Sequence, residues 1–221
     1  MLFPLFAALL CPTAQAQDTV DIGVIRDSEV QVVQRLLYPK AGRTERGVHL
    51  GLMAFDPFLV TPNVALSYDS HRSETLSYGV IVGGGWGLKN AAYRELSSPT
   101  YGIAPDAYRY LASALGGASW TPVYAKAALS GSKVVHFDLY ATGRGGITLE
   151  QSVIPSGGLA VAPTVSGGVG ARVFLDEGAV LRLELRDDAM VEHRSLTDTT
   201  HLKQNVNLTV GYTLLSPRRD R

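Results

Sequence analysis

Apolar and polar residues alternate through residues 133–146, KVVHFDLYATGRGG. The apolar series is Val135, Phe137, Leu139 and Ala141. The polar series between them is His136, Asp138, Tyr140, Thr142 and Arg144. A period of two predicts a β-strand with two unlike faces. A soluble sheet buries its apolar face, whereas a transmembrane barrel turns that face toward lipid and keeps the polar face inside.

Seven further segments alternate in the same way and are separated by glycine, proline and polar clusters. The eight predicted strands are residues 43–53, 62–69, 75–86, 120–129, 133–146, 163–175, 179–188 and 204–215. Most of them are close to the ~9–11 residues that a tilted membrane-spanning strand needs. The sequence therefore predicts an all-β fold, an eight-stranded antiparallel transmembrane β-barrel.

Short and long connections alternate between these strands. The short ones are residues 70–74, 130–132 and 176–178, and the long ones are 54–61, 87–119, 145–162 and 189–203. Outer-membrane barrels have short periplasmic turns, longer outer loops and an even number of strands. We therefore expect both chain ends on the periplasmic side and one long outer loop. A soluble secreted barrel that binds a small apolar ligand is an alternative, but it does not require this alternation.

The polar face of the strands combines glycines with a few long charged side chains. This composition suits a narrow lumen filled by side chains, whereas glycines on a soluble outer surface would only weaken the strands. The predicted polar network of the lumen is Asp69, Lys126, His136, Asp138, Arg172, Arg182, Glu184 and Arg186. The predicted lipid-facing residues are Val135, Phe137, Leu139, Leu183, Leu185, Leu208 and Val210. We expect the lumen charges to pair with one another, because an unpaired buried charge is costly.

The N-terminus reads MLFPLFAALLCPTAQAQ, an apolar run followed by Ala14-Gln15-Ala16. This pattern is typical of a cleaved secretory signal peptide, with the cut before Gln17. The only cysteine, Cys11, would leave with it, so the exported chain would have no thiol chemistry. The predicted organisation is a signal peptide at 1–16, a periplasmic N-terminal lead at 17–42, an outer-membrane barrel at 43–215 and a tail at 216–221.

Two segments outside the strands are candidate working surfaces. Residues 104–115, APDAYRYLASAL, begin with proline and aspartate as helices do, and Tyr108, Leu111 and Leu115 would share one side. This predicted helix either caps the barrel rim or binds a protein partner. In the lead, Ser28 and Gln31 fit a capping box before a short helix that Pro39 would end.

Catalysis has one candidate motif. Residues 191–198, VEHRSLTD, contain Glu192, His193 and Ser195. A lipid hydrolase of the outer membrane would use a His-x-Ser pair with a carboxylate that orients the histidine. We favour a polar loop without activity and expect no enzyme. The histidines lack the spacing of a metal site, so no metal or cofactor is expected. The formal net charge of +0 gives no basic excess for binding nucleic acid.

Several ordered blocks of the chain are similar to a family of bacterial outer-membrane β-barrel domain proteins. The blocks are VVQRLLYPKAGRTERGVHLGL (32–52), LGGASWTPVYAKAAL (115–129), VVHFDLYATGRGGITL (134–149), LRLELRD (181–187) and NVNLTVGYTLL (205–215). The resemblance implies an eight-stranded barrel with a periplasmic lead. Some members resemble components of envelope or surface-motility complexes, and most have no assigned activity. The last strand here ends at Leu215 and not at the aromatic residue common in such barrels.

These inferences together predict a non-enzymatic barrel of the cell outer membrane. It would serve as a structural anchor or subunit of a cell-envelope assembly, in contact with outer-membrane lipids and a protein partner. The alternatives are a lipid hydrolase that uses Glu192, His193 and Ser195, and the soluble ligand-binding barrel.

Overall fold

The computed structural model describes residues 37–54, 56–129, 133–154, 158–194 and 198–217. The predicted signal peptide, residues 17–36 of the predicted lead and Ser195 lie outside these ranges. The strands are β1 (Thr44–Met53), β2 (Leu59–His71), β3 (Leu76–Gly85), β4 (Leu88–Lys89), β5 (Tyr108–Leu129), β6 (Lys133–Ser152), β7 (Leu159–Phe174), β8 (Ala179–Arg194) and β9 (Thr199–Leu215). One helix, α1, covers Ala91–Leu96. Within the described ranges no helix is long and apolar enough to cross a membrane.

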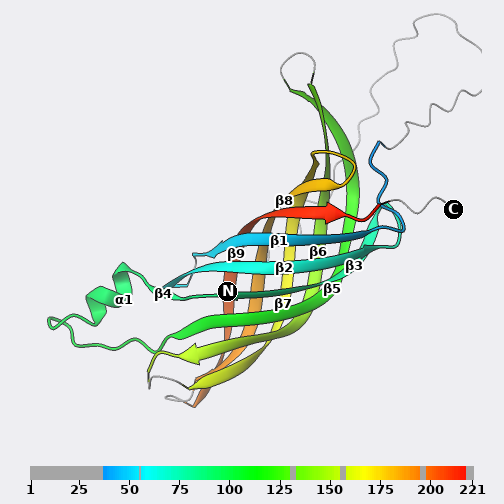
Figure 1. The fold of residues 1–221 in the computed structure, drawn as a ribbon. Helices are drawn as coiled ribbons and strands as arrows, with labels where there is room; N and C mark the ends of the chain where they lie inside the picture. Colours follow the sequence, from blue (N-terminus) through cyan, green and yellow to red (C-terminus); the bar gives the residue numbers. More distant parts are fainter. Residues whose placement is uncertain (1–36, 55, 130–132, 155–157, 195–197, 218–221) are drawn as a thin grey trace, which may run out of the picture. The chain divides into compact units, whose positions relative to one another are not determined.

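Eight strands close into a ring in the order β1-β9-β8-β7-β6-β5-β3-β2, and β2 pairs back to β1 (Figure 1). All of these neighbours are antiparallel. The two-residue strand β4 pairs with Leu59 and Val60, which start β2. Ring closure pairs the strands on both sides and so removes the open edges of a flat sheet. The predicted eight-stranded antiparallel barrel is confirmed.

The barrel is polar inside and apolar outside. In β8, Arg182 and Glu184 are buried, whereas the intervening Leu183 is 50 % exposed. The same inversion repeats around the ring, and the outward leucines, valines and tyrosines form a continuous apolar belt. A monomeric soluble barrel rarely exposes such a large apolar surface to water, whereas contact with lipid stabilises it. The arrangement therefore identifies a transmembrane barrel and excludes the soluble ligand-binding one.

Aromatic residues mark one border of the apolar belt. Tyr68, Tyr78, Trp120 and Tyr212 all point outward near the barrel end that carries the short turns. Trp86 is exposed at the opposite end, directly after β3. Aromatic rings prefer the border between hydrocarbon and water, so these residues mark where the barrel meets the two interfaces.

The predicted helix at residues 104–115 is wrong, because residues from Tyr108 onward belong to β5. The pairing of β5 with β6 shifts register between Tyr110 and Ala112. This bulge brings Tyr108 and Leu115 onto the same inner face, where each is almost fully buried. In a regular strand Tyr108 and Leu115 would face opposite sides, because they are an odd number of residues apart. The bulge puts them on one side, and this spacing is also the spacing of an amphipathic helix. The proposed docking surface of Tyr108, Leu111 and Leu115 is therefore not available to a partner.

The helix forms instead at α1, where the Asn90 side chain accepts a hydrogen bond from the Tyr93 backbone N–H at 3.0 Å. All four predicted outer loops are shorter than expected. β2 begins at Leu59 and β5 at Tyr108, β6 runs to Ser152, and β8 and β9 extend to Arg194 and Thr199. There, polar residues such as Asp187 and Gln204 interrupt the outward apolar series, which resumes at Val191 and Leu202. Backbone pairing continues there although the hydropathy alternation is interrupted.

Candidate functional site

The interior of the barrel is organised around Arg182 on β8. Its guanidinium lies 2.6 Å from Asp69 Oδ2 on β2 and 3.3 Å from Glu184 Oε2. It also lies 3.5 Å from Glu45 Oε1 on β1. The Arg182 Nε–H donates to the Tyr140 hydroxyl at 3.3 Å. Since β8 and β2 are separated in the ring by β9 and β1, this side chain crosses the lumen.

Glu184 is the second centre of the network. Arg144 on β6 binds it with two N–H groups, at 2.7 Å to Oε1 and 3.2 Å to Oε2. The Tyr140 hydroxyl donates to Glu184 Oε2 at 2.8 Å. A bidentate pair of arginine and carboxylate fixes the orientation of both side chains in addition to neutralising their charges. The tyrosine ring also lies beneath Arg172, whose guanidinium carbon is 4.2 Å from the ring centroid.

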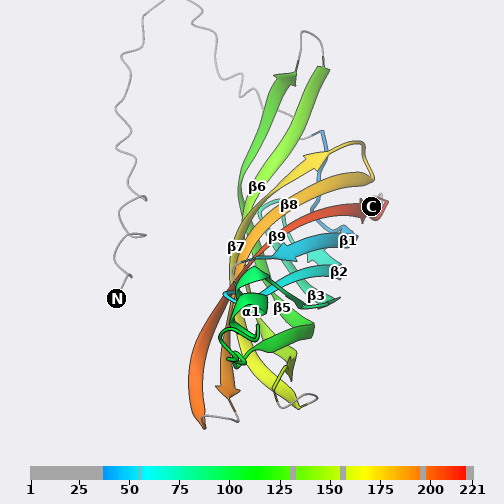
Figure 2. The ribbon, with the colours of Figure 1, turned by 90° about the vertical axis from the view of Figure 1, so that its left-hand side faces the viewer.

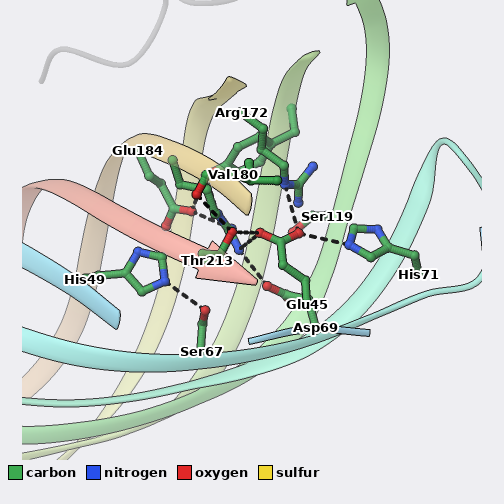
Figure 3. Close-up of polar contacts among 12 residues, drawn as sticks. Glu45, His49, Ser67, Asp69, His71, Ser119, Arg172, Val180, Glu184 and Thr213 are labelled. Atoms are coloured by element: carbon green, nitrogen blue, oxygen red, sulfur yellow. Dashed lines mark hydrogen bonds and ion pairs between the residues drawn. The ribbon is translucent and has the colours of Figure 1, made fainter. Parts of the chain in front are cut away.

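Glu45 is a buried member of the network that the sequence analysis did not name. It accepts from the Thr213 hydroxyl at 2.7 Å and lies 2.9 Å from His71 Nε2 (Figure 3). Arg172 Nε lies 3.4 Å from Glu45 Oε2, the same oxygen that His71 contacts. The sequence pattern could have indicated Glu45, because in β1 it lies an even number of residues from His49 and so points to the same inner face.

The segment Leu37–Arg43, which precedes β1, lies against the barrel mouth at the short-turn end. Lys40 is 2 % exposed and forms a buried ion pair with Asp138 on β6. Burial lowers the pKa of the Lys40 ammonium, and the Asp138 carboxylate opposes this effect. The Tyr38 ring stacks on Phe174, with 5.3 Å between ring centroids.

Arg43 links the same segment to the residue that follows β9 and to the turn before β8. Its side chain donates to the backbone oxygens of Ser216 at 2.6 Å and Glu177 at 2.7 Å. The backbone N–H groups of Lys40 and Ala41 donate to the Glu74 carboxylate at 2.9 and 3.0 Å. The segment is therefore bound to three separate parts of the barrel mouth.

A separate cluster lies toward the long-loop end. Lys203 on β9 lies 3.1 Å from Asp56, 3.3 Å from Glu150 and 3.5 Å from Glu192. Arg194 adds a contact to Glu192 at 3.2 Å. Within the part of the chain that the structure describes, no group of histidine, cysteine, aspartate and glutamate residues is arranged to hold a metal ion.

The candidate catalytic motif is not assembled between its two described members. Glu192 is buried and paired with Lys203 and Arg194, whereas the His193 side chain is 61 % exposed. Consecutive residues of a strand face opposite ways, so Glu192 does not orient His193. His193 lies 3.5 Å from Asp198, an exposed residue of the same rim.

The structure places the other predicted residues as follows. Buried inside the barrel are Asp69, His136, Asp138, Arg172, Arg182, Glu184 and Arg186. Exposed on the outer face are Leu139, Leu183, Leu185, Leu208 and Val210, and Phe137 is half-buried on that face. Val135 is also half-buried, but it lies on the part of β6 that precedes its pairing with β7. Lys126 was predicted to join the lumen network, but it is exposed on a part of β5 that extends beyond the barrel rim. The alternation shows which face of a strand is polar. It does not show where along β5 the neighbouring strand β3 ends.

Chemically, the central network is balanced. Its cations are Lys40, Arg144, Arg172, Arg182 and Arg186, and its carboxylates are Glu45, Asp69, Asp138, Glu184 and Asp188. Such pairing satisfies the charges within a narrow lumen, where they lack full hydration. Glycines make room for it, since a Cβ on Gly170 would lie 2.4 Å from Tyr140 Cζ.

No protein-family model and no curated protein matches the sequence. Among solved structures, Neisserial surface protein A is similar over 78 % of this chain and 95 % of its own, with 10 % identity and a TM-score of 0.43. The N-terminal β-barrel domain of OprF from Pseudomonas aeruginosa is similar over 78 % of this chain and 98 % of its own, with 10 % identity and a TM-score of 0.41. A de novo designed transmembrane β-barrel is similar over 80 % of this chain and 98 % of its own, with 18 % identity and a TM-score of 0.36. On its own geometry, a closed ring of eight antiparallel strands with a charged interior and an apolar outer belt, the chain is an outer-membrane type of β-barrel.

Proposed function

We propose that the protein is a closed, non-enzymatic barrel of the outer membrane that anchors a cell-envelope assembly or forms one of its subunits. The observation that carries this proposal is the set of buried ion pairs that join opposite walls of the barrel. Arg182 on β8 reaches Asp69 on β2, and Arg172 on β7 reaches Glu45 on β1. Side chains that cross the lumen stiffen the barrel and fill the space that a transport path would need.

The bound segment before β1 supports an anchoring role. Lys40 lies inside the barrel mouth, and Arg43 donates to the Ser216 backbone oxygen after β9. A force applied to the residues that precede Lys40 would therefore act on the barrel itself. To extract Lys40, the pull would have to separate a buried ion pair, which is costly. On the predicted topology, this mouth faces the periplasm.

Conductance measurements test the closed barrel. The purified full chain in planar bilayers should give no steady single-channel current, because the network occupies the lumen. Arg182→Ala combined with Glu184→Ala removes the central side chains and serves as the comparison variant. A stable, ion-selective current from the unmodified protein would contradict the proposal.

Lipid analysis tests the absence of enzymatic activity. Cells with the protein, without it, and with His193→Ala should have the same outer-membrane lipid composition. A lipid product that depends on both the protein and His193 would restore the hydrolase and replace the structural role.

A further inference from the structure

The hairpin of β5 and β6 extends beyond the barrel rim at the short-turn end (Figures 1 and 2). On one side, β5 pairs with β3 only as far as Trp120, opposite Leu76. On the other side, β6 begins to pair with β7 at His136, opposite Phe174. Between these points β5 and β6 pair only with each other, as far as Leu129 opposite Lys133. We call the paired residues 123–129 of β5 and 133–135 of β6 the ribbon.

The β5 side of the ribbon is an open strand edge. The last contact with β3 is the hydrogen bond from Thr121 N–H to the Thr75 backbone oxygen, at 2.7 Å. Pro122 follows, and the β5–β6 register shifts between Trp120 and Val123. From Val123 onward, alternate backbone N–H and C=O groups of β5 point away from β6, and no strand among the residues that the structure describes pairs with them. Such an edge is a template for one more strand.

The base of the ribbon is held firmly. Tyr124 lies against Phe174, with 6.0 Å between ring centroids, and Tyr38 stacks on the same Phe174 ring at 5.3 Å. Asp138 on β6 is fixed by Arg172 and Lys40 inside the lumen. Farther out, a two-stranded ribbon is only marginally stable in water, so a third strand would stabilise it.

The charge of the ribbon selects the kind of strand. Residues 120–137 include Lys126 and Lys133 and contain no aspartate or glutamate. Val123 is 42 % exposed and Lys126 is exposed, so the edge offers apolar contact beside positive charge. A second copy would place lysine against lysine, which disfavours self-pairing, whereas carboxylates would be attracted.

We propose that the ribbon binds an acidic, extended segment of a partner protein, which adds to the open edge of β5 as a third strand. The inference rests on the proposed role as an anchor or subunit and names the chemistry of the partner. Backbone hydrogen bonds would supply part of the affinity, and Lys126 would favour an acidic segment.

Peptide binding to the full chain in lipid nanodiscs tests this proposal. The probe is a fluorescent synthetic peptide that alternates valine and aspartate, measured by anisotropy and by amide hydrogen exchange of β5. We expect saturable binding that weakens as salt rises, with new protection at residues 123–127. A peptide with lysine in place of aspartate, and an acidic peptide with N-methyl groups on alternate residues, should both bind at least tenfold more weakly.

Two variants locate the site. Lys126→Glu should weaken binding of the acidic peptide about tenfold, while Lys89→Glu, an exposed lysine at the other barrel end, should not. Replacing residues 127–135 by Asn-Gly closes the hairpin at the Lys126–His136 pair and keeps the lumen network. This variant should bind more weakly, because only residues 123–126 of the open edge remain. The gel shift between unheated and heated samples shows whether this variant still folds.

The other outcomes overturn the proposal. Equal binding of the N-methylated peptide would mean charge attraction without strand addition. A dimer that disappears on truncation of the ribbon would identify a second copy as the occupant. Protection of residues 123–127 in the protein alone, lost on deletion of residues 17–36, would identify the chain's own N-terminal segment. These results leave the conductance and lipid measurements untouched, so failure of this inference is distinct from failure of the proposed function.

Discussion

Replacing Arg182 by methionine should strongly destabilise the barrel, because Asp69 depends on this one side chain. Asp69 is 3 % exposed, and its ion pair is with Arg182 at 2.6 Å. By contrast, Glu184 retains Arg144 at 2.7 Å, and Glu45 retains Arg172 and His71. Leaving a buried charge without its partner costs ~3–5 kcal/mol. We expect the free energy of unfolding of Arg182→Met to fall by about that amount.

The measurement is equilibrium urea unfolding in lipid vesicles, followed by tryptophan emission and by the gel shift of the folded form. Arg94→Met, an exposed arginine on α1, is the matched control and should change stability by less than ~0.5 kcal/mol. In the Arg182→Met background, Asp69→Leu should recover part of the loss, with a coupling energy of ~1–3 kcal/mol. If Arg182→Met matches the control, or Asp69→Leu has the same effect in both backgrounds, the two side chains do not form the pair described.

Three further perturbations address the faces, the packing and the bound segment. Leu183→Arg puts a charge in the lipid-facing belt and should cost ~2–4 kcal/mol in the same unfolding assay if it lies at the midplane; a harmless Leu183→Arg beside a damaging Leu181→Ala would contradict the assigned faces. Gly170→Val drives a side chain into Tyr140 and should lower the yield of folded barrel, whereas Gly167→Val, where an added Cβ has no atom within 4 Å, should be tolerated; equal yields would refute the packing of the lumen. Lys40→Met should release the segment Leu37–Arg43 and make it sensitive to limited proteolysis, while the barrel keeps its gel shift; unchanged protection would show that the Lys40–Asp138 pair does not hold the segment.

The sequence predicted the lengths of the long connections less well than the positions of the strands. The alternation of apolar and polar residues located all eight strands of the ring, but it missed the outer ends of β2, β5, β6, β7, β8 and β9. Outward apolar residues continue at these ends, as at Leu149, Val161 and Leu202. The predicted segments stopped short because glycines, a proline and charged residues interrupt the alternation there. The bulge at Leu111 caused the wrong helix at residues 104–115, since it reverses the parity on which the pattern depends. The helix α1 and the strand β4 lie in a segment that was predicted as a loop.

The sequence by itself determined which side of each strand is polar, because side-chain alternation is a local property of an extended chain. That was sufficient for a barrel with charged residues such as Arg182 inside and Leu183 outside. It could not determine which charges meet, because Arg182 and Glu45 are 137 positions apart and Lys40 and Asp138 are 98 apart. Those pairs depend on how the ring closes and on the stagger between neighbouring strands. The same closure decided that Lys126 lies beyond the rim, since only the positions of β3 and β7 set where the paired wall ends and the open edge begins.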